Sequence, residues 1–168
     1  MKAYFNAEDL AYYTSQSFEK KFKEKISSIK LQKSLYFLFA YWGGFVKKSN
    51  QASKDDRESF EVKDYRPYLF DNTIEAWIYG PVVPSVFKSF DLNNKEQAQK
   101  ACVKINGFPF VKAFIDDLLN DLFRVSDFKL VDLSHQDKSW KDQFCYLESF
   151  HNHEIKKEDI LDEYSKRI

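Results

Sequence analysis

Apolar residues recur every three or four positions along most of this chain, the spacing that places them on one face of an α-helix. The clearest stretch follows Pro109, where Val111, Ile115 and Leu118 share one face and polar residues occupy the other. Only four glycines and four prolines interrupt the chain. The sequence therefore predicts a mainly α fold, a single compact multi-helix domain of six to eight helices, with at most a small β-hairpin near residues 65–80.

Capping residues and helix breakers set the expected helix boundaries. Asn6 and Ser28 are of the types that cap helix N-termini, and Pro84 suits a first helical turn. Gly43 and Gly44 follow an apolar helix, so we expect them to end it as a C-cap rather than to bind phosphate. The expected helices span approximately residues 7–19, 28–42, 84–90, 96–104, 109–123, 127–135, 138–147 and 157–164.

Residues 47–63 form one polar interruption of the helical pattern. Their Ser, Asn and Asp residues favour turns, so we expect an exposed excursion there. A chain of 168 residues is long enough to bury one core, with roughly 70% of its extended surface leaving water on folding. We therefore expect residues 1–168 to form one domain that carries the excursion on its surface.

The charges of the chain balance, with 26 Lys and Arg residues against 26 Asp and Glu residues. A net charge of zero removes the usual electrostatic argument for nucleic acid or an anionic membrane as a partner. Residues 20–25 include four lysines, but Glu19 and Glu24 dilute this stretch, and a charged helix end is the expected outcome. A nucleic-acid partner is therefore not favoured, and no membrane contact is expected.

Apolar runs and cysteine usage indicate the compartment. No apolar run reaches the roughly 18 residues that a membrane-spanning helix needs, and residues 1–6 lack the apolar region of a secretory signal. Cys102 and Cys145 form no CxxC pair and no cysteine framework. These observations predict a cytoplasmic protein with free thiols.

The chain offers weak candidates for catalysis. Cys102 and Cys145 have apolar neighbours, so we expect both to fill the core, where burial raises the pKa of a thiol. Asp116 and Asp117 point about 100° apart on a helix, so they do not form a carboxylate pair by themselves. With Asp121 they are expected to form a solvated face. We therefore expect no catalytic residue, no cofactor and no enzymatic activity.

His151 and His153 form a closely spaced pair of histidines. An H-x-H pair can place two imidazoles on one metal ion, and Glu148 and Glu154 could add oxygen ligands. The segment has the pattern of a loop between helices, so two solvated histidines are the expected outcome. We expect no metal site.

Residues 75–84, EAWIYGPVVP, combine large amphipathic aromatic residues with residues that restrict the backbone. Two prolines and a glycine within five residues leave little conformational freedom to lose on ordering. Trp77 and Tyr79 are of types enriched at interface hot spots. Two interpretations stay open: the rings contact a partner from a rigid platform, or they lock the turn to the core.

Three motifs in order resemble the Panacea-domain family, which includes the SocA-like antitoxins and the phage-associated GepA-like proteins. The similarity covers roughly residues 6–165. The motifs are KLQKSLYF at 30–37, LF at 69–70 leading to EAWIYGPVVPSVF at 75–87, and LSH at 133–135 followed by Trp140.

The resemblance implies a mostly helical antitoxin that neutralises a toxin encoded nearby by direct binding, and it implies no catalytic residue. Ser34 departs from the leucine frequent in the first motif, and the polar segment 47–63 is longer than in many relatives. The residues at the family's motif positions either maintain the common scaffold or touch the toxin. They are Lys33, Trp77, Tyr79, Gly80, Pro81, His135 and Trp140.

Two alternative functions stay open. The SocA-like branch implies a proteolysis adaptor that delivers its partner to a ClpXP-type protease. His135, His151 and His153 leave room for a metal-dependent hydrolase of phage or mobile-element origin. Neutralisation by binding needs about 800 Å² of surface per partner and no acid, base or metal, which agrees with the weak catalytic pattern. The oligomeric state and the identity of the toxin follow from no motif of this chain.

Overall fold

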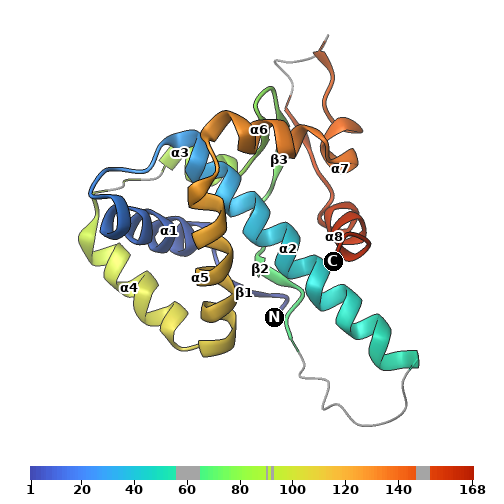
Figure 1. Cartoon of the computed structure of the whole chain (residues 1–168), viewed down its shortest axis with the longest axis horizontal. Coiled ribbons are helices and arrows are strands. Elements are labelled where there is room, and N and C mark those ends of the chain that lie inside the picture. The colour runs from blue at the N-terminus through green and yellow to red at the C-terminus, as the bar shows by residue number, and fades with distance from the viewer. Residues whose placement is uncertain (56–64, 90, 92, 147–151) are drawn as a thin grey trace.

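The computed structural model describes residues 1–55, 65–89, 91, 93–146 and 152–168. One long helix, α2, runs through the middle of the molecule, and α1, α5, α6 and α8 pack against it (Figure 1). The predicted mainly α fold is confirmed, with eight helices among the described residues. They are α1 (Ala7–Phe22), α2 (Ser28–Asp55), α3 (Pro84–Ser89), α4 (Lys95–Asn106), α5 (Pro109–Arg124), α6 (Asp127–His135), α7 (Lys138–Lys141) and α8 (Lys157–Ser165).

Two small sheets complete the described fold. Their strands are β1 (Ala3–Phe5), β2 (Tyr68–Phe70), β3 (Glu75–Trp77), β4 (Gly80–Val82) and β5 (His153–Glu154). β1 pairs in parallel with β2, and the second sheet has the antiparallel order β4-β3-β5. The predicted hairpin is present as β3 and β4, whereas β1 and β5 carry no sequence pattern long enough to predict them.

Side-chain caps fix the starts of α1 and α2. Asn6 Oδ1 accepts a hydrogen bond from the N–H of Asp9 at 2.7 Å, and α1 begins after Asn6 as predicted. The predicted cap at Ser28 is wrong, because Ser28 is already helical and Ser27 Oγ accepts the N–H of Lys30 at 3.0 Å. Two consecutive serines made the sequence signal ambiguous by one residue.

α2 continues through Gly43 and Gly44, so the predicted C-cap at this pair is wrong. Both glycines are buried against α8. A Cβ on Gly44 would lie 2.7 Å from Cβ of Tyr164 and 2.8 Å from its carbonyl carbon, and a Cβ on Gly43 would overlap the Leu161 side chain. The pair allows two helices to approach closely, and no helix ends there.

In the excursion predicted at 47–63, residues 48 and 50–52 are exposed as expected, but the first part is helical and forms no loop. Residues 47–55 are the last turns of α2, and residues 56–64 lie outside the described residues. Lys47 forms ion pairs with two carboxylates of α8. The polar residues at the end of α2 thus continue the helix, and the first of them contacts α8.

α7 is shorter than the predicted helix 138–147. It ends at Lys141, and Phe144 stacks on the Trp140 ring with the centroids 4.8 Å apart. Leu147 lies outside the described residues. An aromatic stack therefore takes the place of the helical turns that the apolar spacing predicted.

The core is built on α2, whose residues 31–40 are all buried. Trp42 and Tyr36 are its largest fully buried side chains. Trp42 Nε1 donates a hydrogen bond to the carbonyl oxygen of Arg66 at 2.9 Å, which satisfies the polar tip of the indole. Buried apolar residues from both ends of the chain form one cluster with α2. α2 is therefore the element against which the rest of the fold is positioned.

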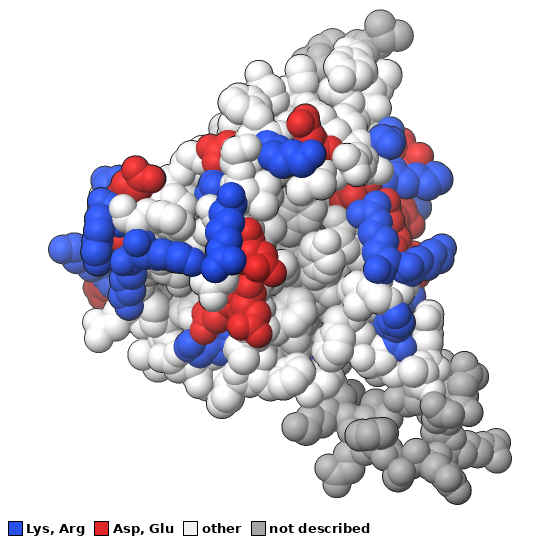
Figure 2. Space-filling model, viewed as in Figure 1, with Lys and Arg blue, Asp and Glu red and all other residues white. Residues whose placement is uncertain are grey.

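The surface mixes charges of both signs. On the face shown in Figure 2, Lys and Arg side chains lie among Asp and Glu side chains, as the balanced composition suggests. Among the described residues, no helix combines the length and the apolar character needed to cross a membrane.

Candidate functional site

The turn that joins β3 to β4 is packed between α2 and α6. Ile78 and Tyr79 form the turn, and Gly80 follows with a φ of +97°, a conformation that favours glycine. Gly80 is buried, and a Cβ there would overlap Ser134 Oγ and lie 3.0 Å from Lys33 Nζ. Only a residue without a side chain fits between these two helices.

Lys33 of α2 holds the strand that leaves the turn. Its side chain is 1% exposed, and Nζ donates a hydrogen bond to the carbonyl oxygen of Pro81 at 2.6 Å. Burial lowers the pKa of Lys33 to about 7, because surroundings of low dielectric disfavour the charged ammonium. Lys33 is therefore a buried donor to the backbone of β4.

Gln32, the preceding residue of α2, anchors the end of the hairpin. Its Oε1 accepts the N–H of Val83 at 2.8 Å, and its Nε2 donates to the carbonyl oxygen of Val83 at 3.4 Å. One side-chain amide thus satisfies both backbone groups of a buried residue. Together with Lys33, it fixes the hairpin to α2.

His135 and Trp140 hold the other side of the turn. Trp140 Nε1 donates to the carbonyl oxygen of Trp77 at 2.9 Å, and His135 Nε2 lies 3.0 Å from the carbonyl oxygen of Ile78. Their rings stack with the centroids 4.2 Å apart and the planes 18° apart. Burial lowers the pKa of His135, and the nearby Lys33 charge adds to this, while the hydrogen bond to Ile78 opposes it. A neutral imidazole that donates through Nε2 fits this geometry.

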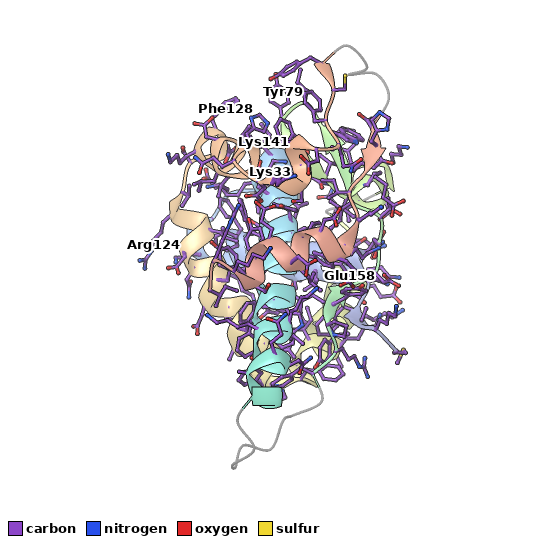
Figure 3. All side chains as sticks on the ribbon, turned by 90° about the vertical axis from the view of Figure 1, so that its right-hand side faces the viewer. Lys33, Tyr79, Arg124, Phe128, Lys141 and Glu158 are labelled. Carbon is purple, nitrogen blue, oxygen red and sulfur yellow. The ribbon has the colours of Figure 1, made fainter. Side chains whose placement is uncertain are left out.

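Around the turn, apolar side chains face outward. Trp77 Nε1 donates to Glu75 Oε2 at 2.8 Å, and the indole meets the edge of the Phe87 ring. Ile78 is 48% exposed, Tyr79 56% and Phe87 54%, and we call these three residues the turn surface. They border a hollow of about 160 Å³ with almost entirely apolar walls and α2 along one side. Figure 3 shows the labelled Tyr79 at the edge of the molecule and Lys33 inside it on α2.

The structure brings all seven family-motif residues to this turn. Tyr79 is the most exposed of them. The buried members contact the turn or its strands. The half-buried members also take part: His135 contacts the turn and stacks on Trp140, and the carbonyl oxygen of Trp77 accepts the hydrogen bond from Trp140. The buried members are Lys33, Gly80, Pro81 and Trp140, and the half-buried ones are Trp77 and His135.

Three residues of the site were not singled out from the sequence. Gln32 and Ser134 are polar residues in otherwise buried parts of α2 and α6, and that mismatch is the signal that could have identified them. Ile78 acts partly through its carbonyl oxygen, which no side-chain pattern reveals.

The cysteine predictions need correction. Both thiols are free, as expected, but Cys145 is exposed and does not fill the core. Cys102 is half-buried, and its Sγ donates to Gln16 Oε1 at 2.9 Å. Burial raises the pKa of Cys102.

Asp116 is partly exposed, so the predicted solvated face is only partly correct at this residue. It accepts a hydrogen bond from the Tyr13 hydroxyl at 2.5 Å and forms an ion pair with Lys112. Asp117 and Asp121 are exposed, as expected. The periodicity was correct for the helix, but α1 packs closely enough to engage one of the three carboxylates.

The histidine pair is only partly described. His153 lies in β5 and not in a loop, whereas His151 and Glu148 lie outside the described residues. Within the described parts of the chain, no three His, Cys, Asp or Glu side chains are grouped so that they could hold a metal ion. His135 stacks instead on Trp140.

The turn lies together with α6 and α7 in a segment that matches a known domain. The family model described as antitoxin SocA-like, Panacea domain, matches residues 56–141, just over half of the chain's 168 residues. This chain belongs to that family. The match includes the hairpin, α6 and α7 but is shorter than the expected 6–165, and Lys33 of α2 lies outside it. No curated protein and no solved structure matches the chain.

Proposed function

We propose that this chain is the antitoxin of a toxin–antitoxin pair and neutralises its toxin in the cytoplasm by binding it through the turn surface. The proposal rests on one observation in this antitoxin-type domain: the motif residues hold the backbone of the hairpin and leave the side chains of its turn exposed. Lys33 and Trp140 donate to backbone carbonyls of the hairpin, and His135 hydrogen-bonds there as well, while Ile78 and Tyr79 face solvent.

A turn held in this way favours tight binding. Hydrogen bonds and stacked rings restrict its backbone before a partner arrives, so little conformational entropy is left to lose on association. Tyrosine supplies a large contact area with few rotatable bonds, and it is enriched among the residues that dominate interface energetics. Tyr79 is therefore the expected anchor.

The turn surface is too small alone for a stable interface, which needs about 800 Å² per partner. α6 contacts the hairpin and exposes two further apolar side chains, Phe128 at 65% and Leu133 at 36%. Figure 3 shows the labelled Tyr79 and Phe128 at the same end of the molecule. We assign α6 to the same toxin-binding face.

The polar chemistry of the site supports a role in binding. The Lys33 amine and the His135 ring nitrogen nearest the turn both interact with backbone carbonyl oxygens. A general base or nucleophile needs its reactive atom free to reach a substrate. The same contacts instead keep the turn in one shape.

Growth rescue tests the proposed function. The toxin encoded beside this gene is induced with the wild-type chain, with a variant carrying Ile78→Asp and Tyr79→Ala, or with Val103→Asp as control. Val103 is 67% exposed on α4, so its replacement introduces the same charge on an unrelated helix. We expect the wild type and the control to restore growth and the turn variant to fail.

Toxin lifetime separates direct neutralisation from delivery to a protease. Under direct binding, the toxin co-purifies with the wild-type chain and its half-life does not fall. The proposal would be refuted if the toxin arrests growth to the same extent with and without the wild-type chain.

A further inference from the structure

A second apolar surface lies away from the turn, between α5 and Arg167 and Ile168, the residues that follow α8. α5 and α8 both pack on α2, and Figure 1 shows them on either side of its visible face. This surface is a groove of about 410 Å³, with Tyr41 and Phe45 of α2 as its floor and Phe114 and Leu118 of α5 as one wall. It shares no residue with the turn surface, and we call it the α5–α8 groove.

The floor of the α5–α8 groove is preformed. The Phe45 and Phe114 rings stack with the centroids 6.3 Å apart, and Phe114 also packs against Trp42 at 5.2 Å. The Tyr41 ring meets Tyr164 edge-on at 4.9 Å. These ring contacts hold the floor in place, so a ligand does not need to open it.

The two walls of the groove differ in whether their charged side chains form ion pairs. Asp117 and Asp121 stand one helical turn apart on α5, both are exposed, and neither forms an ion pair within the part of the chain that the structure describes. Arg167 on the opposite wall is already paired with Asp137 and Glu163. Figure 2 shows Asp and Glu side chains gathered over α5, with Lys and Arg side chains along one edge of them. The unmatched charge at the groove is therefore negative.

We propose that the α5–α8 groove docks an amphipathic helix of a protein partner that carries Lys or Arg along one edge. The floor and both walls come from helices and the chain end after α8, so the groove offers no free strand edge for an extended peptide. A helix satisfies its own backbone groups and can therefore lie on an apolar floor. The acidic wall disfavours a phosphate backbone or an anionic membrane.

The dimensions and charges set the pattern of the docked helix. The lining of α5 runs from Phe114 to Asp121, which is about 10 Å along the helix axis, or two helical turns. The occupant therefore presents apolar side chains at i, i+4 and i+7. Its basic edge faces Asp117 and Asp121, and this pairing fixes the direction in which the helix lies.

A peptide titration tests the inference and does not depend on the proposed antitoxin function. The probe is a synthetic helical 14-mer with leucines at i, i+4, i+7 and i+11 and lysines along one edge, and its control carries glutamates in place of the lysines. Both are titrated into the full chain by isothermal calorimetry. We expect the lysine peptide to bind and the glutamate peptide to bind at least tenfold more weakly.

Protein variants locate the binding. Asp117→Lys with Asp121→Lys should weaken the lysine peptide at least tenfold, whereas Glu19→Lys with Glu24→Lys, the same charge change on exposed residues near the end of α1, should not. Circular dichroism confirms that both variants fold. No binding of the lysine peptide, equal binding of the two peptides, or equal loss in both variants would overturn the inference.

Discussion

Lys33 shows how one residue links the site to the stability of the fold. A lysine with 1% of its side chain exposed is costly to bury in charged form, and its pKa falls to about 7 from an ordinary value of 10.5. Above about pH 7 the folded chain releases this proton while the unfolded chain keeps it. The unfolded state then binds more protons, so folding stability rises with pH between about 7 and 10.5.

Replacement of Lys33 by methionine should remove this pH dependence. One pKa unit corresponds to about 1.4 kcal/mol, so the wild type should gain about 2 kcal/mol in free energy of unfolding between about pH 7.5 and about pH 9. The Lys33→Met variant should gain much less. Urea denaturation at both pH values measures the difference.

Lys129 provides the control, since it is an exposed lysine of α6. Lys129→Met should follow the wild type at both pH values. An equal gain in the wild type and in Lys33→Met would contradict the assignment of the effect to Lys33.

Gly80 should tolerate no side chain. A positive φ of +97° strains any L-residue, and a Cβ would overlap Ser134 Oγ. Gly80→Ala should lower the free energy of unfolding by about 2 kcal/mol or more. Gly107→Ala, at an ordinary φ of −66°, should cost less than about 1 kcal/mol. Thermal and urea denaturation compare the two, and similar losses would argue against a special conformation at the turn.

At the scale of elements, α2 packs closely on α8 through Gly43 and Gly44. Glycines that would be expected to end a helix here allow two helices to approach each other. Glycine inside a helix normally costs about 1 kcal/mol relative to alanine. Gly44→Ala should nevertheless destabilise by about 1–3 kcal/mol, because its Cβ would meet the backbone of Tyr164 at 2.8 Å. Gly43→Ala should cost less than Gly44→Ala, since it meets only the side chain of the buried Leu161, which can change rotamer more easily than backbone can move. Chemical denaturation ranks the two variants, and the opposite order would contradict this packing.

Asp137 joins α2, α7 and α8 through one carboxylate. It is fully buried, accepts the hydroxyls of Tyr36 at 2.5 Å and Tyr164 at 2.8 Å, and pairs with Arg167 at 2.7 Å. Asp137→Asn should cost about 2–3 kcal/mol, because charge-assisted hydrogen bonds are lost inside the fold. Asp132→Asn, at an exposed position of α6, should cost little. Equal stability of the two variants in urea would show that the buried carboxylate adds nothing.

Local signals explain the elements that could be predicted from the sequence. Asn6 and Ser126 cap their helices, Pro84 opens α3, and the apolar stripe of α5 needs only its own spacing. The role of Gly43 could not be predicted from local sequence, because its neighbour Leu161 lies on α8, more than a hundred residues along the chain. β1 and β5 have three residues and two, too few for a strand pattern.

Part of the candidate site could be named from the sequence, but the contacts that its residues make could not. The motif residues were identified from sequence, and they do meet at one turn. Their bonds run to backbone carbonyls, such as those of Pro81 and Ile78, and a carbonyl has the same chemistry in every residue. Ser134 and Gln32 acquire their roles only once α2 and α6 enclose Gly80.

At the scale of the whole molecule, α2 serves two surfaces at once. Near its start, Lys33 and Gln32 hold the hairpin that carries the turn surface. Further along, Tyr41 and Phe45 form the floor of the α5–α8 groove. A rigid central helix thus presents two separate faces, and replacements at one should leave binding at the other unchanged.

The most direct test of this account is the affinity of the purified chain for its proposed partner, an inactivated form of a toxin encoded beside its gene, measured by calorimetry. The variant with Ile78→Asp and Tyr79→Ala should bind at least about 100-fold more weakly than the wild type, since both side chains belong to the anchor of the interface. Val103→Asp should bind as the wild type does. Equal affinity of all three folded proteins would contradict the claim that the turn surface binds the toxin.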